Sequence, residues 1–315
     1  MSRIVATGSY LPKNTMTNNE LITQTGIDSS DEWITQRTGI QKRHFASSDE
    51  KVSTLAVKAA KHVLEQVEET VLQEVQFILV ATMSSGLPTP SVASQVQREL
   101  GIEEAFAFDI SGACSGFVMA MEMAEKLSRD QSSGYTLVIG AEKMSNILDF
   151  TDRGTSILFG DGAGALLIEH DGEGLPNYQS HLTSIPDPEN SIHVPTDADS
   201  SGLMTMAGRE VFNFVLRKVI PSLSDFIEEH ARDLDYLISH QANYRFIEIM
   251  AKKLNLNLDQ IPANISQVAN TSAGSIPILL DQLVKEEKIH LNGRQKVVFV
   301  GYGAGLAWGQ ISISI

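Results

Sequence analysis

The sequence contains one cysteine, Cys114, among its 315 residues. A single thiol excludes an internal disulfide framework and any zinc or iron–sulfur site that needs several thiolates from one chain. The eight histidines show no H-x-x-x-H or similar spacing, which argues against a structural metal site. Cys114 is therefore expected to be either a small buried structural residue or a nucleophile.

Export signals and long apolar runs are also missing. The amino terminus, MSRIVATGSYLPKN, has no basic region followed by an apolar stretch, so it does not resemble a signal peptide. The uncharged run from Val75 to Gln97 contains two prolines and many Ser, Thr and Gln residues, unlike a membrane-spanning helix. We expect a cytoplasmic protein without a membrane partner.

Positive charge is scarce, since 24 Lys and Arg residues face 39 Asp and Glu residues, for a formal net charge of −15. This excess of negative charge argues against general binding to nucleic acid or anionic membranes. An acidic partner would need a local basic patch. The 42% hydrophobic and 20% charged residues fit a globular protein, and the length allows one or two domains with sizeable cores.

Short apolar runs alternate with stretches of helical period, which is typical of an α/β fold. A helix is predicted after Cys114, and another from Val211 with an interruption near Pro221. The segment from Ser184 to Met206 is predicted to be a long ordered loop beside a site or a mobile flap. Strands are predicted over 76–81, 105–110, 135–140, 165–169, 236–239 and 296–300.

The two parts of the chain echo each other. SGACSGF, a helix and YTLVIGAE match NTSAGSI, a helix and KVVFVGYG, which indicates duplicated βαβ units related by a pseudo-two-fold axis. A boundary is predicted near Asp171, giving halves of 1–170, with Cys114, and 171–315, with His240 and Asn270. If the halves face each other, their strand-end loops bring these three side chains to one site.

Each of these residues also has an alternative interpretation. Cys114 begins a predicted helix, where the helix dipole and unpaired N–H groups favour the thiolate. His240 in SHQAN and Asn270 in ANTSAGS could each be structural when taken alone. The glycine-rich run GDGAGA over 160–165 lacks the lysine of a P-loop and the Rossmann spacing, and is interpreted as close structural packing.

Four motifs in order, SGACSGF, SHQAN, ANTSAGS and GYGAGLAWG, closely resemble those of the β-ketoacyl-[acyl-carrier-protein] synthase III family of condensing enzymes. The resemblance runs from ATGSYLPKN to the carboxyl terminus and includes DEWITQRTG, DRGTSILFGDGAGA and GREVF. It implies an α/β thiolase-like fold, in which duplicated βαβ-containing halves form a five-layered αβαβα sandwich, and a homodimer. A hydroxymethylglutaryl-CoA synthase would need a glutamate base, which the strand end ATMSSG does not offer.

The resemblance also implies the first condensation of type II fatty acid biosynthesis. Cys114 would take the acyl group of a short acyl-CoA, while His240 and Asn270 would stabilise the enolate formed when malonyl-acyl carrier protein loses CO2. The acyl oxygen would be held by the Cys114 N–H and the turn Gly303, Ala304 and Gly305. No metal is expected, and no cofactor beyond the coenzyme A thioester substrate. A related CoA-dependent condensing enzyme or acyltransferase of secondary metabolism is the alternative; a non-catalytic acyl-binding relative is disfavoured because the Cys, His and Asn are all present.

Three contact surfaces follow from the same resemblance. Thr89 would reach the partner subunit's acyl pocket. Some relatives have Phe at this position, so the smaller Thr predicts a roomier pocket that accepts primers longer or more branched than acetyl. Coenzyme A would be bound, with its adenine stacked on an indole and a guanidinium, by Trp33, Arg37, Thr38, Arg153, Gly208 and Phe212. The acidic carrier protein would dock, in a salt-sensitive way, on Gln241, Arg245, Lys252 and Lys253.

Overall fold

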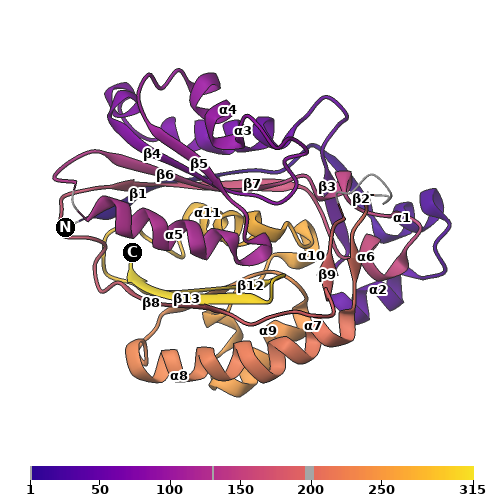
Figure 1. Cartoon of the computed structure of the whole chain (residues 1–315). Coiled ribbons are helices and arrows are strands. Elements are labelled where there is room, and N and C mark those ends of the chain that lie inside the picture. The colour runs from indigo at the N-terminus through magenta and orange to yellow at the C-terminus, as the bar shows by residue number, and fades with distance from the viewer. Residues whose placement is uncertain (1, 130, 196–201) are drawn as a thin grey trace.

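A computed structural model describes residues 2–129, 131–195 and 202–315. The chain forms five layers in the order helices, sheet, helices, sheet, helices (Figure 1). This is the predicted αβαβα sandwich. Within the described residues no helix is both long enough and apolar enough to cross a membrane.

The first sheet contains five strands in the order β1-β7-β6-β4-β5. Strand β4 is parallel to β5 and β6, whereas β7 is antiparallel to both β6 and β1. Helices α3 (Val52–Leu64) and α4 (Val92–Leu100) pack their apolar residues on its outer face. The strands are β1 Arg3–Tyr10, β7 Gly162–Glu169, β6 Tyr135–Glu142, β4 Val75–Ala81 and β5 Phe106–Ile110.

The second sheet contains four strands in the order β11-β12-β13-β8. Strand β11 is parallel to β12, and the remaining pairs are antiparallel. Helices α8 (Ile220–His230) and α9 (Tyr244–Leu254) cover its outer face. The strands are β11 Tyr236–Ser239, β12 Lys296–Gly303, β13 Ala307–Ser314 and β8 Gln179–Ser184.

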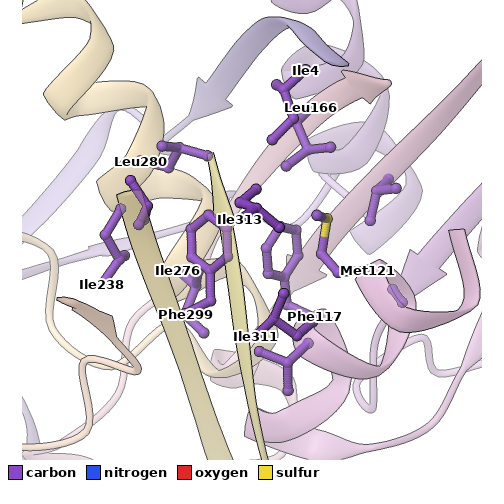
Figure 2. Packing of buried hydrophobic residues seen from close by; sticks show 14 of the residues in the cluster. Ile4, Phe117, Met121, Leu166, Ile238, Ile276, Leu280, Phe299, Ile311 and Ile313 are labelled. Atoms are coloured by element: carbon purple, nitrogen blue, oxygen red, sulfur yellow. The ribbon is translucent and has the colours of Figure 1, made fainter. Parts of the chain in front are cut away.

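Two central helices, α5 (Gly116–Ser128) and α11 (Ser275–Lys285), lie between the sheets (Figure 1). Their apolar side chains join residues of both sheets in one buried cluster (Figure 2). Phe117 of α5 meets Phe299 of β12 edge to face, with ring centroids 6.4 Å apart. The central layer therefore ties the two sheets together, as expected for a helix that is apolar around most of its circumference.

The short strand pairs and most of the short helices lie at one end of the sandwich (Figure 1). The short strand pairs are β2 Asn14–Thr17 with β3 Lys42–Phe45, and β9 Ile192–His193 with β10 Thr205–Met206. The further helices are α1 Asn18–Thr25, α2 Asp31–Thr38, α6 Arg153–Ser156, α7 Gly208–Phe214 and α10 Ile265–Val268. Single turns are η1 Glu69–Glu74, η2 Ala113–Ser115, η3 Met144–Asn146, the π-turn η4 Val215–Val219, η5 Leu258–Gln260 and η6 Ser272–Gly274.

Two predictions from the sequence, about the helix around Pro221 and the segment 184–206, differ from the structure. The predicted interruption near Pro221 is wrong, because α7, η4 and α8 follow one another directly and Pro221 lies in the first turn of α8. The π-turn that ends two residues before Pro221 accommodates the proline, whose ring and missing N–H disturb the regular pattern of an α-helix. The predicted loop over 184–206 contains the β9–β10 pair, while its residues 196–201 lie outside the described part of the chain.

The predicted duplication is visible in the two loops that lead into the central helices. The first loop enters η2 through Ala113, with φ 44°, and the second enters η6 through Ser272, with φ 48°. Each loop packs on a glycine of the other half: η6 on Gly140 of β6, and η2 on Gly301 of β12. The boundary near Asp171 itself stays a prediction.

Glycine is required at these crossings because backbone lies directly above them. A Cβ atom on Gly140 would overlap the backbone carbonyl of Ala273, and one on Gly164 would overlap backbone atoms of Pro277 and Ile278. Backbone atoms cannot rotate away as a flexible side chain can. The interpretation of GDGAGA, which includes Gly164, as close structural packing is therefore confirmed.

Gly140→Ala should lower the free energy of unfolding by roughly 3 kcal/mol, because overpacking against fixed backbone forces the η6 loop to move. Gly208→Ala is the matched control, since Gly208 has an ordinary φ and its added Cβ would meet only a methionine methyl group at 3.9 Å. The control should change the free energy by less than about 0.5 kcal/mol. Urea unfolding measures both values, and equal stability of the two variants would contradict this packing argument.

Candidate active site

Cys114, His240 and Asn270 line one cavity of about 320 Å³. Cys114 lies in η2, His240 directly follows β11, and Asn270 lies two residues before η6. All three side chains are buried. The prediction that the two halves bring these three residues to one place is thus confirmed.

Cys114 is a protonated thiol in this structure. Its Sγ donates to the Ser272 hydroxyl at 3.4 Å. Burial raises the pKa of the Cys114 thiol to about 12; the negative charge of Glu142 raises it further, and the Ser272 hydrogen bond offsets part of the rise. Burial therefore opposes the thiolate that the helix start is expected to favour, and Cys114 lies two residues before the first residue of α5.

His240 presents a neutral imidazole. Its Nδ1 lies 2.7 Å from the Ser275 hydroxyl, whose oxygen also accepts the backbone N–H of Gln241 at 3.4 Å. This arrangement favours a Ser275 hydroxyl that donates to Nδ1, so that the proton of the ring is on Nε2. Burial lowers the pKa of His240 to about 3, which keeps the ring neutral at physiological pH. His240 can therefore donate a hydrogen bond without carrying charge.

The Asn270 amide is oriented by the backbone. Its Oδ1 accepts the N–H of Ser272 at 2.8 Å. Because an N–H group can only donate, the acceptor atom must be the amide oxygen, and the NH2 group is left for a ligand. His240 and Asn270 together offer two neutral N–H donors to the cavity shared with Cys114.

The predicted oxyanion turn lies against Cys114. Gly303 and Ala304 line the cavity, and a Cβ atom on Gly303 would lie 3.0 Å from both the N and the Cβ of Cys114. A side chain at this position would therefore displace the Cys114 loop by a few tenths of an ångström. Gly305, with φ 128°, is not a lining residue and shapes the turn into β13.

Glu142 is a buried residue of the site that the sequence reasoning missed. It ends β6, and its carboxylate accepts hydrogen bonds from the Ser272 hydroxyl at 3.2 Å and the Thr82 hydroxyl at 3.2 Å. Burial raises the pKa of Glu142 to about 7 despite these hydrogen bonds. The strand end ATMSSG has no glutamate of its own, as the sequence shows, but neighbouring β6 places Glu142 beside it, where the carboxylate accepts the N–H of Met83 at 3.2 Å. An acid directly after the apolar strand run YTLVIGA was the available signal.

The predicted coenzyme A residues gather at one side of the cavity. Arg37 and Arg153 both lie over the ring of Trp33, at 5.3 and 4.8 Å from its centroid. The Asn243 side chain donates to the Arg37 carbonyl at 3.1 Å, which ties α2 to the start of α9. Of the six predicted residues, those lining the cavity are Arg37, Thr38, Gly208 and Phe212.

The predicted carrier-protein residues divide into two groups. Arg245, Lys252 and Lys253 are exposed on α9, and Arg245 also lines the cavity. Gln241 is fully buried and donates to the Ser239 carbonyl at 2.8 Å, so its assignment to a docking surface is wrong. Its side-chain hydrogen bond instead fixes the loop that follows β11. Thr89 is exposed and does not line this chain's cavity, so its proposed contact with a partner subunit stays a prediction.

Alkylation by iodoacetamide should distinguish burial from the helix dipole as the dominant influence on Cys114. The rate should keep rising beyond pH 9, because an unperturbed cysteine titrates near pH 8.5 and burial moves Cys114 well above that value. Because Cys114 is the only cysteine, mass spectrometry of the whole protein reads the reaction directly. A rate that levels off at or below about pH 8 would mean that the helix dipole lowers the pKa of Cys114 more than burial raises it.

Comparison with known proteins connects these features to a family. The family models "3-Oxoacyl-[acyl-carrier-protein (ACP)] synthase III" and its C-terminal counterpart match residues 108–185 and 228–315. A β-ketoacyl-[acyl-carrier-protein] synthase III of Streptococcus gordonii is 41% identical, over 100% of this chain and 99% of the relative.

Solved structures agree with the sequence comparison. The 3-oxoacyl-[acyl-carrier-protein] synthase III of Aquifex aeolicus VF5 superposes with a TM-score of 0.89 at 36% identity, with 100% of both chains covered. The priming β-ketosynthase of the R1128 polyketide pathway gives 0.90 at 30% identity, with 99% of this chain and 96% of that chain covered. This chain belongs to the 3-oxoacyl-[acyl-carrier-protein] synthase III family and is a condensing enzyme with the thiolase fold.

Proposed function

We propose that this protein catalyses the initiating condensation of type II fatty acid biosynthesis, joining a short acyl-CoA to malonyl-acyl carrier protein to give 3-ketoacyl-acyl carrier protein, CO2 and coenzyme A. The observation that carries the proposal is the single cavity lined by a thiol, Cys114, and two oriented N–H donors, His240 and Asn270. A nucleophile for the acyl group and donors for an enolate are the two requirements of this reaction.

In the first step, the Cys114 sulfur attacks the acyl thioester and releases coenzyme A. The acyl oxygen becomes negative as the sulfur adds, and the Cys114 N–H and the turn that begins at Gly303 supply the donors nearest to it. The close packing of Gly303 on Cys114 supports this assignment. The reaction leaves an acyl thioester on the enzyme and an open cavity beside it.

In the second step, malonyl-acyl carrier protein loses CO2 and the resulting enolate attacks acyl-Cys114. Neutral donors suit the enolate, because His240 and the Asn270 amide can both give hydrogen bonds without losing a proton. The low pKa of His240, about 3, supports a role as a donor rather than as an acid that is charged at rest. Carbon–carbon bond formation then regenerates the Cys114 thiolate, which takes up a proton.

The entrance of the cavity suits an acidic carrier protein and a nucleotide-bearing thioester. Arg37 and Arg153 beside Trp33 offer an aromatic and cationic surface for an adenine ring. Arg245, Lys252 and Lys253 concentrate positive charge on α9 in a chain of net charge −15. Such a patch steers an acidic partner and weakens with added salt.

A homodimer is part of the proposal. Strand β5 is an edge of the five-stranded sheet, and Phe106 at its start is 63% exposed. Leu87 and Met123 are also exposed, at 47% and 39%. An unpaired edge strand with exposed apolar side chains is a template for pairing with a second chain. The primer preference attributed to Thr89 depends on this dimer, and it remains a prediction, as does the cytoplasmic location.

A priming role in secondary metabolism is the second candidate, supported by the similarity to the R1128 priming β-ketosynthase. The purified protein should convert acetyl-CoA and malonyl-acyl carrier protein to the acetoacetyl product if the leading proposal is correct. Consumption of malonyl-CoA without any need for the carrier protein would favour the second candidate. If the protein catalyses neither reaction, both candidates are refuted.

His240→Ala and Asn270→Ala should slow decarboxylation of malonyl-acyl carrier protein by about 10²–10³, because each removes one donor to the enolate oxygen. Acylation of Cys114 by acetyl-CoA should change much less. The two steps are measured separately, by CO2 release and by the mass of the intact enzyme. Lost acylation with normal decarboxylation would show that these roles are assigned wrongly.

Phe106→Lys should shift the protein from dimer to monomer, because it places a charge at the exposed start of the β5 edge. Leu258→Lys is the control: Leu258 is 52% exposed but lies in η5, beside the second sheet. Sedimentation velocity at several concentrations gives the assembly state. An unchanged dimer in Phe106→Lys, or equal dissociation of both variants, would contradict the β5 interface.

A further inference from the structure

A hydrogen-bonded chain leads from the nucleophile into the protein. The Cys114 thiol donates to the Ser272 hydroxyl at 3.4 Å, and the Ser272 hydroxyl donates to Glu142 Oε1 at 3.2 Å. Both donors point the same way, from sulfur toward the carboxylate. A proton can therefore leave the sulfur by two short transfers, without a charged group entering the cavity.

We propose that Glu142 accepts the proton of Cys114 through the hydroxyl of Ser272 as the thiol attacks the acyl thioester. The step rests on the proposed function above, since it concerns the acylation half of that reaction. Ser272 is the catalytic residue that touches the reacting thiol. Glu142 acts through it as the proton acceptor.

The atoms balance in one exchange. The Cys114 S–H bond breaks as its proton passes to the Ser272 oxygen, whose own proton passes to Glu142 Oε1. The sulfur electron pair forms the bond to the acyl carbon, and the bond from that carbon to the coenzyme A sulfur breaks. The proton held by Glu142 then returns along the same chain to the coenzyme A sulfur, which leaves as a thiol. No oxidant or further reactant is needed.

Other groups near the thiol are poorer acceptors. His240 has Nδ1 engaged with Ser275 and a pKa lowered to about 3 by burial, so it binds a proton weakly. Tyr302 donates its hydroxyl to the His240 carbonyl at 3.3 Å, and burial raises its pKa, so it remains protonated. Among the described ionisable groups around Cys114, Glu142 is the one with a basic atom at the end of a hydrogen-bonded path.

The surroundings of Glu142 set it near neutrality. Burial raises its pKa to about 7, against the lowering effect of donors from Ser84, Met83, Thr82 and Ser272. No ion pair of the described residues includes it, and the ammonium of neighbouring Lys143 instead donates to the carbonyls of Ser47 and Glu50 at 2.8 and 2.7 Å. A general base is most useful when its pKa lies close to the working pH.

The counterpart strand of the other half has no carboxylate at the matching position. Glu142 is the eighth residue of β6, and the eighth residue of β12, its counterpart in the other half, is Gly303. Gly303 packs on the loop of Cys114, and Glu142 contacts the matching loop at Ser272. The first half therefore has a buried acid, Glu142, at the position where the second half has a glycine, Gly303.

Single-turnover acylation by acetyl-CoA, measured from pH 5.5 to 9 without carrier protein, tests the relay. The wild-type rate should fall as the pH drops through about 7, because protonated Glu142 cannot accept the thiol proton. Glu142→Gln should lose this pH dependence and react about 10²–10⁴ times more slowly, the usual contribution of a general base. Glu142→Asp should recover part of the rate.

Two further variants keep the test valid if Glu142→Gln does not fold. Ser272→Gly removes the hydroxyl but keeps the N–H that holds Asn270, and glycine readily adopts φ 48°. It should slow acylation while decarboxylation of malonyl-acyl carrier protein continues. Thr82→Val removes one donor from the Glu142 carboxylate, so the midpoint of the acylation profile should move to higher pH.

Acylation at the wild-type rate by Ser272→Gly and Glu142→Gln would overturn the relay, as would a midpoint that Thr82→Val leaves unmoved. If Glu142 had only a structural role, we would expect those results, or equal losses of acylation and decarboxylation. Failure of the proposed function looks different: wild-type enzyme would then form no acyl-Cys114 with any acyl-CoA, which would also remove the step for which the relay is proposed.

Discussion

The close approach of two loops to two sheets is the constraint on which the site depends. The η6 loop lies on Gly140 of the first sheet, and the η2 loop lies on Gly301 of the second. Each half therefore holds the loop of the other half, and α5 and α11 are fixed between them. The nucleophile comes from one loop, Asn270 from the other, and His240 from the strand end beside them, so a shift of either loop would separate the three.

The same packing determines the protonation of the site. Removing water raises the pKa of Cys114 and Glu142 and lowers that of His240, because burial disfavours whichever form is charged. The resting site thus has a neutral thiol and a neutral imidazole, with an acid that titrates near pH 7. Chemistry in such a site relies on fixed hydrogen-bond donors and short proton transfers, and apart from the Glu142 carboxylate these groups carry no charge at rest. This explains why two N–H donors and a hydroxyl surround the reacting atoms.

Sequence patterns predicted the parts of the fold in which apolar runs are continuous. All six predicted strands are present, including 76–81 within β4 and 236–239 as β11. Strands β1 and β13 were missed, because RIVATGSY and AWGQISIS mix glycine and polar residues with apolar ones. Those residues are nevertheless mostly buried, since the neighbouring strands and helices cover them on both faces.

The motifs also located Cys114, His240 and Asn270, whose positions follow from strand-end loops that meet. Side-chain direction was harder to predict. Gln241 sits beside His240 in the sequence yet turns inward, and Glu142 reaches a strand end more than fifty residues away. Desolvation likewise depends on the full three-dimensional surroundings, so the high pKa of Cys114 was not available from its place at a helix start.

Transfer of one acetyl group through Cys114 tests the account most directly. Enzyme carrying radiolabelled acetyl on Cys114 is isolated, mixed with malonyl-acyl carrier protein, and followed on both proteins in one time course. The account predicts that label leaves Cys114 at the rate at which labelled acetoacetyl-acyl carrier protein appears, in equal amounts. Label that stays on Cys114, or leaves as free acetate while product forms from another source, would contradict a condensation within this cavity.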